Sequence, residues 1–233
     1  MKYMTGSLAF SIRNIGRAVG LNRLVSKIIS SDHYEEKFER GMLNLIQDGD
    51  VVWDIGANVG LYTEKFLDQV GNSGQVCAFE PAPGAVQILV DRFKGKENVR
   101  ILSYAMGNVD GEVEMLLDEN DPASVVNKII DAKSDVRGKM VKVRTANSVV
   151  ISGEVPLPNV IKIDVEGYEL SVVKGMEPLL VNDNLRCVAI EVHFGLLNDR
   201  NEGFAPKEIE HTLTKCGFCV KWTDPSHIVA SRK

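Results

Sequence analysis

The stretch Val51-Val52-Trp53-Asp54-Ile55-Gly56-Ala57-Asn58-Val59-Gly60 decides the fold of this chain. Its first five residues are apolar apart from Asp54, which is typical of a strand covered on both faces. The glycines at positions 56 and 60 permit a tight turn, and the residues that follow run into a helical pattern. A buried strand, a glycine turn and a helix in this order predict the first unit of a parallel α/β sheet.

The same alternation continues along the chain. We expect strands at residues 51–55, 75–80, 99–104, 159–164 and 186–193. Helical patterns separate them at residues 60–70, 83–94, 168–181 and 206–216. Because uninterrupted hydrophobicity indicates strands buried on both faces, we predict a doubly wound α/β domain with a mostly parallel sheet. Residues 218–222 and 227–230, on either side of a turn at Asp224-Pro225-Ser226, predict a C-terminal antiparallel hairpin.

One segment breaks this rhythm. Polar, strand-like pieces at residues 112–117 and 140–143 flank the stretch from Asp118 to Arg137. We interpret the segment as an insertion that lines or gates a site.

The N-terminal segment differs from the rest of the chain in charge. Its first thirty-one residues contain five basic side chains and no acidic one, and apolar residues recur near helical spacing. We therefore divide the chain into an N-terminal basic amphipathic helical appendage, residues 1–35, and a main domain, residues 36–233. The appendage fits a cap over the domain, a helix in peripheral contact with a membrane, or a transit-like leader, and no window suits a transmembrane span.

The composition argues against some classes of partner. With 27 Lys and Arg against 32 Asp and Glu the chain is mildly acidic, so we expect no nucleic acid and favour a small-molecule acceptor. Cys216 and Cys219 have a C-x-x-C spacing, but no second pair completes a zinc site. Buried, reduced thiols indicate a cytoplasmic protein, peripheral to the membrane if residues 1–31 bind one.

Two acidic residues stand at the ends of the first two predicted strands. Asp54 would repel a diphosphate but suits an ammonium group, and the G-x-N-x-G turn differs from the G-x-G-x-x-G that seats a pyrophosphate. Glu80 follows Gly60 by twenty residues, where nucleotide-binding folds use a carboxylate to accept both ribose hydroxyls. The spacing predicts a site for a nucleoside with a charged tail.

Three motifs together resemble FkbM-type methyltransferases: residues 54–60 (DIGANVG), residues 79–83 (FEPAP) and residues 161–169 (IKIDVEGYE). The resemblance covers about residues 36 to 222 and implies a class I methyltransferase (Rossmann-like) fold with S-adenosyl-L-methionine as cofactor. It also implies O-methylation of a hydroxyl on a saccharide, lipid-linked or other small-molecule acceptor. By this resemblance the cofactor would lie against these residues: Asp54, Gly56, Asn58, Gly60, Glu80, Tyr104, Ala105 and Asp164. Where the family often has a glycine-rich segment, this chain has Asp121-Pro122-Ala123-Ser124, which leaves the acceptor open.

Methyl transfer to an alcohol needs a base near the acceptor oxygen. Asp164 ends the fourth predicted strand, and Glu191 and His193 share a face of the fifth, so these ends open on the cofactor crevice. We expect His193 to be the general base, oriented by Glu191, with Asp164 facing the cofactor or acceptor. Glu166 and Glu169 either assist or favour the start of the next helix.

The alternatives are of three kinds. Asp164, Glu166, Glu191 and His193 also suit a divalent metal, although base catalysis without a metal needs fewer coincidences and is our expectation. A nicotinamide-dependent oxidoreductase would also have a glycine turn after the first strand and an acidic residue after the second, but with a different spacing of the glycines. A non-catalytic cofactor-binding or membrane-surface module remains the third alternative.

Overall fold

The computed structural model describes residues 31–117, 128–129 and 138–232. Residues 1–30, which make up most of the predicted appendage, lie outside the described residues, as does most of the predicted insertion. Helix α3 spans Ser31–Leu43 and therefore crosses the boundary that we predicted at residue 35. Within the described ranges, every helix is too short or too polar to cross a membrane.

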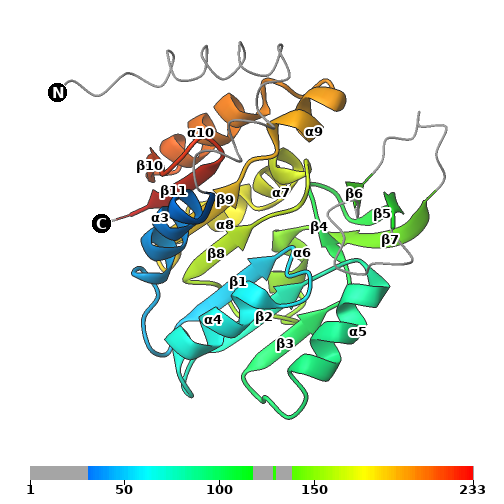
Figure 1. Cartoon of the computed structure of the whole chain (residues 1–233), viewed down its shortest axis with the longest axis vertical. Helices are drawn as coiled ribbons and strands as arrows, with labels where there is room; N and C mark the ends of the chain where they lie inside the picture. The colour runs from blue at the N-terminus through cyan, green and yellow to red at the C-terminus, as the bar shows by residue number, and fades with distance from the viewer. Residues whose placement is uncertain (1–30, 118–127, 130–137, 233) are drawn as a thin grey trace.

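The described elements form two sheets with helices around the larger one (Figure 1). The larger sheet has the order β10-β11-β9-β8-β1-β2-β3. Its strands are β1 (Val51–Ile55), β2 (Gln75–Phe79), β3 (Val99–Leu102), β8 (Val160–Ile163), β9 (Cys187–Glu191), β10 (Cys219–Trp222) and β11 (His227–Ser231). The five strands from β3 to β9 are parallel, whereas β11 pairs antiparallel with both β9 and β10. The doubly wound sheet and its closing hairpin are thus as predicted.

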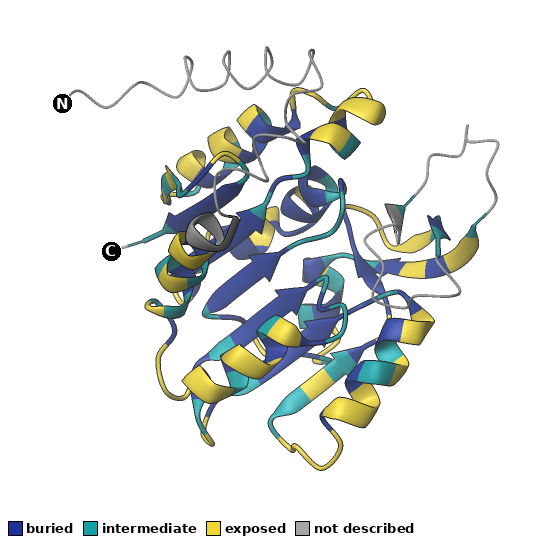
Figure 2. Ribbon diagram, viewed as in Figure 1, coloured by how far each residue is buried: buried dark blue, intermediate teal, exposed yellow. Residues whose placement is uncertain are grey.

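Successive residues of each parallel strand point to opposite faces of the sheet, and each face is covered. On one face, Val52 packs with Phe38 and Met42 of α3 and with Phe66 of α4 (Leu61–Val70). On the other face, Trp53 belongs to the largest core cluster. That cluster includes α6 (Ala146–Ile151), α7 (Glu169–Gly175), α8 (Glu177–Leu180) and α10 (Ala205–Lys215). Figure 2 shows the resulting buried sheet between helices with exposed outer sides.

The smaller sheet comes from the segment that interrupts the predicted alternation. It has the order β4-β7-β5-β6, with β4 at Ala105–Met106, β5 at Gly111–Leu116, β6 at Lys128–Ile129 and β7 at Lys139–Arg144. It meets α5 (Pro83–Arg92) through a cluster that joins Ala85 to Met115 and Val141. The sheet stands beside the carboxyl ends of the parallel strands (Figure 1).

Several predicted boundaries differ from the structure. The helix predicted over residues 168–181 is two helices, α7 and α8, with a break at Met176 just before Pro178, whose ring nitrogen has no hydrogen to donate. Strand β9 ends at Glu191, so His193 lies beyond it, at the N-terminus of α9 (Phe194–Asp199). Neither α6 nor α9 was predicted from the sequence, because each has only six residues.

The order of the parallel strands reverses between β1 and β8, where the chain crosses to the other half of the sheet. Open α/β sheets bind their ligands in the crevice at such a point, outside the carboxyl ends of the strands. The loops after β1, β2 and β8 meet there.

Candidate active site

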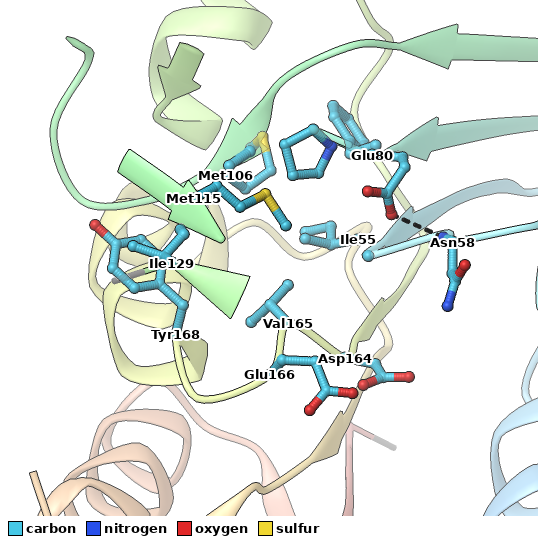
Figure 3. Close-up of a pocket in the computed structure, with 14 residues that line it drawn as sticks. Ile55, Asn58, Glu80, Met106, Met115, Ile129, Asp164, Val165, Glu166 and Tyr168 are labelled. Carbon is cyan, nitrogen blue, oxygen red and sulfur yellow. Dashed lines mark hydrogen bonds between the residues drawn. The ribbon is translucent and has the colours of Figure 1, made fainter. Parts of the chain in front are cut away.

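A pocket lies at the carboxyl ends of β1, β2 and β8 (Figure 3). Its polar lining is made by Asn58, Glu80, Asp164 and Glu166. Its apolar lining includes Met106, Met115, Ile129 and Tyr168. The small sheet supplies three of these apolar side chains, so the pocket is enclosed between the two sheets. A cavity that combines apolar side chains with a few convergent polar groups is typical of a small-molecule site.

The glycine turn after β1 brings the backbone close to β8. Gly56 has φ +80°, and a Cβ atom there would lie 1.8 Å from the carbonyl oxygen of Asp164. Only glycine fits both the left-handed backbone and this close approach. Asn58 and Glu166 also adopt positive φ values, of 48° and 49°, and both line the pocket. Backbone strain of this kind gathers at functional sites.

Glu80 is fixed by two backbone hydrogen bonds. Its Oε2 accepts from the N–H of Asn58 at 2.8 Å, and its Oε1 accepts from the N–H of Ala82 at 2.8 Å. Burial raises the pKa of Glu80, although both hydrogen bonds act in the opposite direction. Each carboxylate oxygen keeps a further lone pair, so the group can still accept two hydroxyl hydrogens from a ligand in the pocket.

Lys162 joins the ends of β1 and β8 beneath the pocket. Its Nζ lies 3.5 Å from Asp54 Oδ1 and 3.2 Å from Asp164 Oδ2, and it is only 3% exposed. Burial lowers the pKa of this ammonium group, but Asp164 and Asp54 outweigh burial and raise it overall. Asp54 is fully buried and accepts a hydrogen bond from Thr63 Oγ1 at 2.6 Å. The lysine therefore remains charged between two carboxylates.

A cluster of one imidazole and four carboxylates adjoins the pocket; we call it the His193 cluster. His193 Nδ1 lies 2.7 Å from Glu169 Oε1. Its Nε2 faces the other three carboxylates, at 3.3 Å from Glu166 Oε2, 3.7 Å from Asp164 Oδ1 and 3.8 Å from Glu191 Oε1. Asp164 and Glu166 line the pocket, so the cluster opens on it.

The carboxylates control the charge of His193. Burial lowers the pKa of its imidazole, but the hydrogen bond to Glu169 and the surrounding carboxylates raise it to about 9. Burial and neighbouring carboxylates raise the pKa of Glu166 to about 7. Burial opposes ionisation of Asp164, yet Lys162 and His193 hold its pKa below the ordinary value. In this state the imidazole is a cation at neutral pH.

A second imidazole extends the His193 cluster through Glu191. His227 Nε2 lies 3.5 Å from Glu191 Oε2, while its Nδ1 lies 2.8 Å from Asp224 Oδ1. Burial lowers the pKa of His227, but hydrogen bonds to Asp224 and Glu191 raise it to about 9. His227 comes from β11, which pairs with β9 so that His227 stands opposite Glu191.

The predicted cofactor residues divide into two groups. Five of them line the pocket: Gly56, Asn58, Glu80, Ala105 and Asp164. The other three lie behind it. Asp54 is buried against Lys162, and a Cβ atom at Gly60 would lie 2.6 Å from the ring of Phe93. Tyr104 is 7% exposed and packs between Phe79 and Arg144.

The predicted catalytic residues Asp164, Glu191 and His193 come together, and one donor atom from each lies within 4.8 Å of the others. Sequence reasoning missed Lys162, although a lysine inside an apolar strand is itself a signal of a buried charge pair. It also missed His227 and Asp224, because the place of the hairpin beside β9 could not be read from spacing.

The sheet order, the glycine turn after β1 and the acidic end of β2 match those of a class I methyltransferase domain, whose cofactor is S-adenosylmethionine. A family model described as Methyltransferase FkbM domain matches residues 54–220. The chain belongs to the FkbM methyltransferase family.

A curated relative supports the same family. Hexuronic acid methyltransferase AglP of Haloferax volcanii is 32% identical over 192 residues, which cover 81% of this chain and 72% of that protein.

Two solved structures support the fold. An FkbM methyltransferase from Methylobacillus flagellatus has a TM-score of 0.51 at 13% identity. The match covers 94% of this chain, which spans only 60% of that longer one. Aeropyrum pernix fibrillarin, solved with bound S-adenosyl-L-methionine, has a TM-score of 0.50 at 13% identity, covering 83% of this chain and 74% of its own. The expectation of a class I methyltransferase is confirmed, and the oxidoreductase alternative is set aside.

Proposed function

We propose that the chain transfers the methyl group of S-adenosylmethionine to a hydroxyl of a saccharide acceptor. The observation that carries this proposal is the adjacency of two polar regions in one pocket. Glu80 and Asn58 lie on one side, and Asp164 and Glu166 lie on another (Figure 3).

The cofactor orientation follows from the polar groups. Glu80 would accept both ribose hydroxyls, since its carboxylate is already fixed by the N–H groups of Asn58 and Ala82. Ala105 and Met106 would lie against the adenine, which needs an apolar surface. Gly56 and Asn58 would contact the methionine part, and Asp164 would attract its ammonium group.

The acceptor would enter beside the His193 cluster. Saccharides present several hydroxyls, and carboxylates at close spacing are good acceptors for them. The relative from Haloferax volcanii is named as a hexuronic acid methyltransferase, which supports a sugar as the acceptor class. The apolar wall of Met115, Ile129 and Tyr168 would cover the reacting atoms from water.

The reaction is an in-line displacement. The bond from the acceptor oxygen to the methyl carbon forms as the carbon–sulfur bond breaks, and S-adenosylhomocysteine leaves with the electron pair of that bond. The hydroxyl proton would pass to the His193 cluster, of which Asp164 and Glu166 line the pocket. His193 as general base stays a prediction, and the pKa of about 9 does not favour it in the unliganded protein.

The test is a transfer assay with methyl-labelled S-adenosylmethionine. Glucose, free glucuronic acid and lipid-linked hexuronic acids serve as acceptors, and mass spectrometry locates the new methyl group. A methyl ether survives mild alkali, whereas a methyl ester of a uronic carboxylate is released, so the treatment distinguishes the two oxygens. We expect an alkali-stable product.

Glu80→Gln serves as the control that ties transfer to the pocket, and it should reduce the labelled product at limiting cofactor. An alkali-labile product would contradict the proposal that a hydroxyl is methylated. If the protein binds the cofactor but labels none of the sugars, the proposal of a saccharide acceptor is wrong.

A further inference from the structure

Three donor groups converge from two neighbouring strand ends. Asp164 follows β8, Glu191 ends β9, and His193 lies two residues beyond Glu191. Because β8 and β9 are adjacent and parallel, both ends open at the same edge of the sheet. One oxygen or nitrogen from each residue lies within 4.8 Å of the other two.

The spacing suits ligands of one metal ion. His193 Nε2 is 3.7 Å from Asp164 Oδ1 and 3.8 Å from Glu191 Oε1. Ligand atoms bound at roughly 2.0–2.3 Å to one ion lie about 3 to 4 Å apart when adjacent. The donors therefore need to move only slightly to share an ion, which would take the place of the proton on His193 Nε2.

Other groups already orient two of the three donors. Lys162 holds Asp164 Oδ2 at 3.2 Å, which leaves Oδ1 directed toward His193. Glu169 Oε1 holds His193 Nδ1 at 2.7 Å, which leaves Nε2 directed toward the carboxylates. A metal-binding histidine usually donates its other ring N–H to a carboxylate, a backbone carbonyl or a water molecule, and Glu169 is such an acceptor.

Glu169 adds uncompensated negative charge to the His193 cluster. Its side chain is fully buried, and its head group lies at the His193 cluster because Oε1 contacts the imidazole. Its second oxygen, Oε2, has no hydrogen-bond partner among the described residues. A buried carboxylate oxygen without a donor is costly, and an ion bound on the Nε2 side of the imidazole would offset part of that cost by its charge rather than by contact.

We propose that Asp164, Glu191 and His193 bind one divalent metal ion at the edge of the pocket. One imidazole with two carboxylates suits a transition-series ion such as Mn²⁺ better than Ca²⁺, which prefers oxygen ligands alone. The metal role replaces that of general base for His193, since one lone pair cannot serve both.

The role of the ion rests on the proposed function. Glu166 lies 3.3 Å from His193 Nε2 and lines the pocket, so the ion would stand beside the acceptor. A hydroxyl bound to a divalent ion gives up its proton more readily than a free one. Glu166 would then be the nearest remaining carboxylate to receive it.

The test measures metal binding apart from activity. The full chain, treated with chelator, is titrated with Mn²⁺, and the free ion is followed by electron paramagnetic resonance. We expect one ion per chain, and at least a tenfold weaker affinity in Glu191→Gln and in His193→Ala. Glu154→Gln is the matched control, because Glu154 is 36% exposed against 35% for Glu191 and pairs with Arg144 instead.

Equal Mn²⁺ affinity in Glu191→Gln and Glu154→Gln, or no saturable binding by the wild type, would overturn the metal site. Titration of the same metal-free samples with S-adenosylmethionine checks that each variant is folded. That titration also distinguishes failure of the metal site from failure of the proposed function. If the protein binds S-adenosylmethionine but not Mn²⁺, the metal site is wrong and the methyltransferase proposal is unaffected.

Discussion

Glu80 combines burial with two backbone hydrogen bonds, and this combination sets how the cofactor pocket responds to acid. Burial raises the pKa of Glu80 above its ordinary value. Only the ionised form offers acceptors on both oxygens to a ribose. Cofactor affinity should therefore fall as the pH falls through this raised pKa, beginning at a higher pH than for an exposed glutamate.

Glu80→Gln tests that role directly. The amide has one acceptor oxygen, so we expect S-adenosylmethionine to bind about tenfold more weakly or worse, from a loss of roughly 1–3 kcal/mol. Calorimetry across a range of pH should give a flatter profile than the wild type. Glu64→Gln, on the exposed side of α4, should keep the wild-type affinity and profile; if both variants behave alike, Glu80 is not the ribose acceptor.

The cysteines give a second residue-scale prediction. Burial raises the pKa values of Cys77 and Cys187 to about 12. Both thiols stay protonated at mildly alkaline pH, so Ellman's reagent should reach neither in the folded protein. Cys219 is exposed, whereas we predicted a buried thiol there, and it should react. Counting reactive thiols before and after guanidinium addition checks this. Prompt reaction of all four in the native state would mean that the sheet is not packed as described.

Single positions were predictable where a motif fixed them. The spacing of Gly56, Asn58 and Glu80 was enough to bring these residues to one pocket. Lys162 was missed because one of its partners, Asp54, lies on a neighbouring strand, while the other, Asp164, follows its own strand. The spacing of residues along the chain does not show which strands pair in a sheet.

At the scale of elements, the close approach of the β1 turn to β8 is the contact that shapes the pocket. Gly56→Ala should lower stability by about 2–4 kcal/mol, because the new Cβ would meet the Asp164 carbonyl at 1.8 Å and the backbone has φ +80°. Gly153→Ala separates these causes. That glycine has φ +69° but nothing within 4 Å of its Cβ position, so we expect about 1 kcal/mol there.

Urea unfolding of both variants measures the difference. Equal losses would show that backbone strain alone matters and that the turn does not press on β8.

Lys162 links β1 to β8 by charge. Lys162→Met would leave the fully buried Asp54 without its cation, so we expect a loss of about 3–5 kcal/mol. Lys65→Met is the comparison, since Lys65 is 46% exposed in its pair with Glu39 and should change stability by less than about 1 kcal/mol. Thermal unfolding of the two variants side by side gives the answer, and similar melting temperatures would contradict the bridging role.

Helices and strands with a clear hydrophobic pattern could be predicted from the sequence, whereas very short ones could not. The five parallel strands follow from mostly apolar runs such as residues 51–55, in which Asp54 is the one polar residue. The six-residue helices α6 and α9 are too short for a period to emerge. Strands β4 and β6 have only two residues each, and they are recognised as strands by their pairing with β7 and β5. Two residues are too few for a sequence pattern, so the sequence predicted an insertion here but not the small sheet that lines the pocket.

For the whole molecule, composition and alternation predicted one doubly wound domain, and the structure has it. The place of the C-terminal hairpin did not follow from the sequence, because β11 inserts between β9 and β10 rather than continuing in chain order. That insertion brings His227 to Glu191 and so extends the His193 cluster.

Calorimetric titration of the purified chain with S-adenosylmethionine and, separately, with NAD is the most direct measurement of what the pocket holds. The glycine turn and Glu80 predict saturable one-to-one binding of S-adenosylmethionine and no heat of binding with NAD. Binding of NAD, or no binding of S-adenosylmethionine, would contradict the assignment of this pocket to a methyltransferase cofactor.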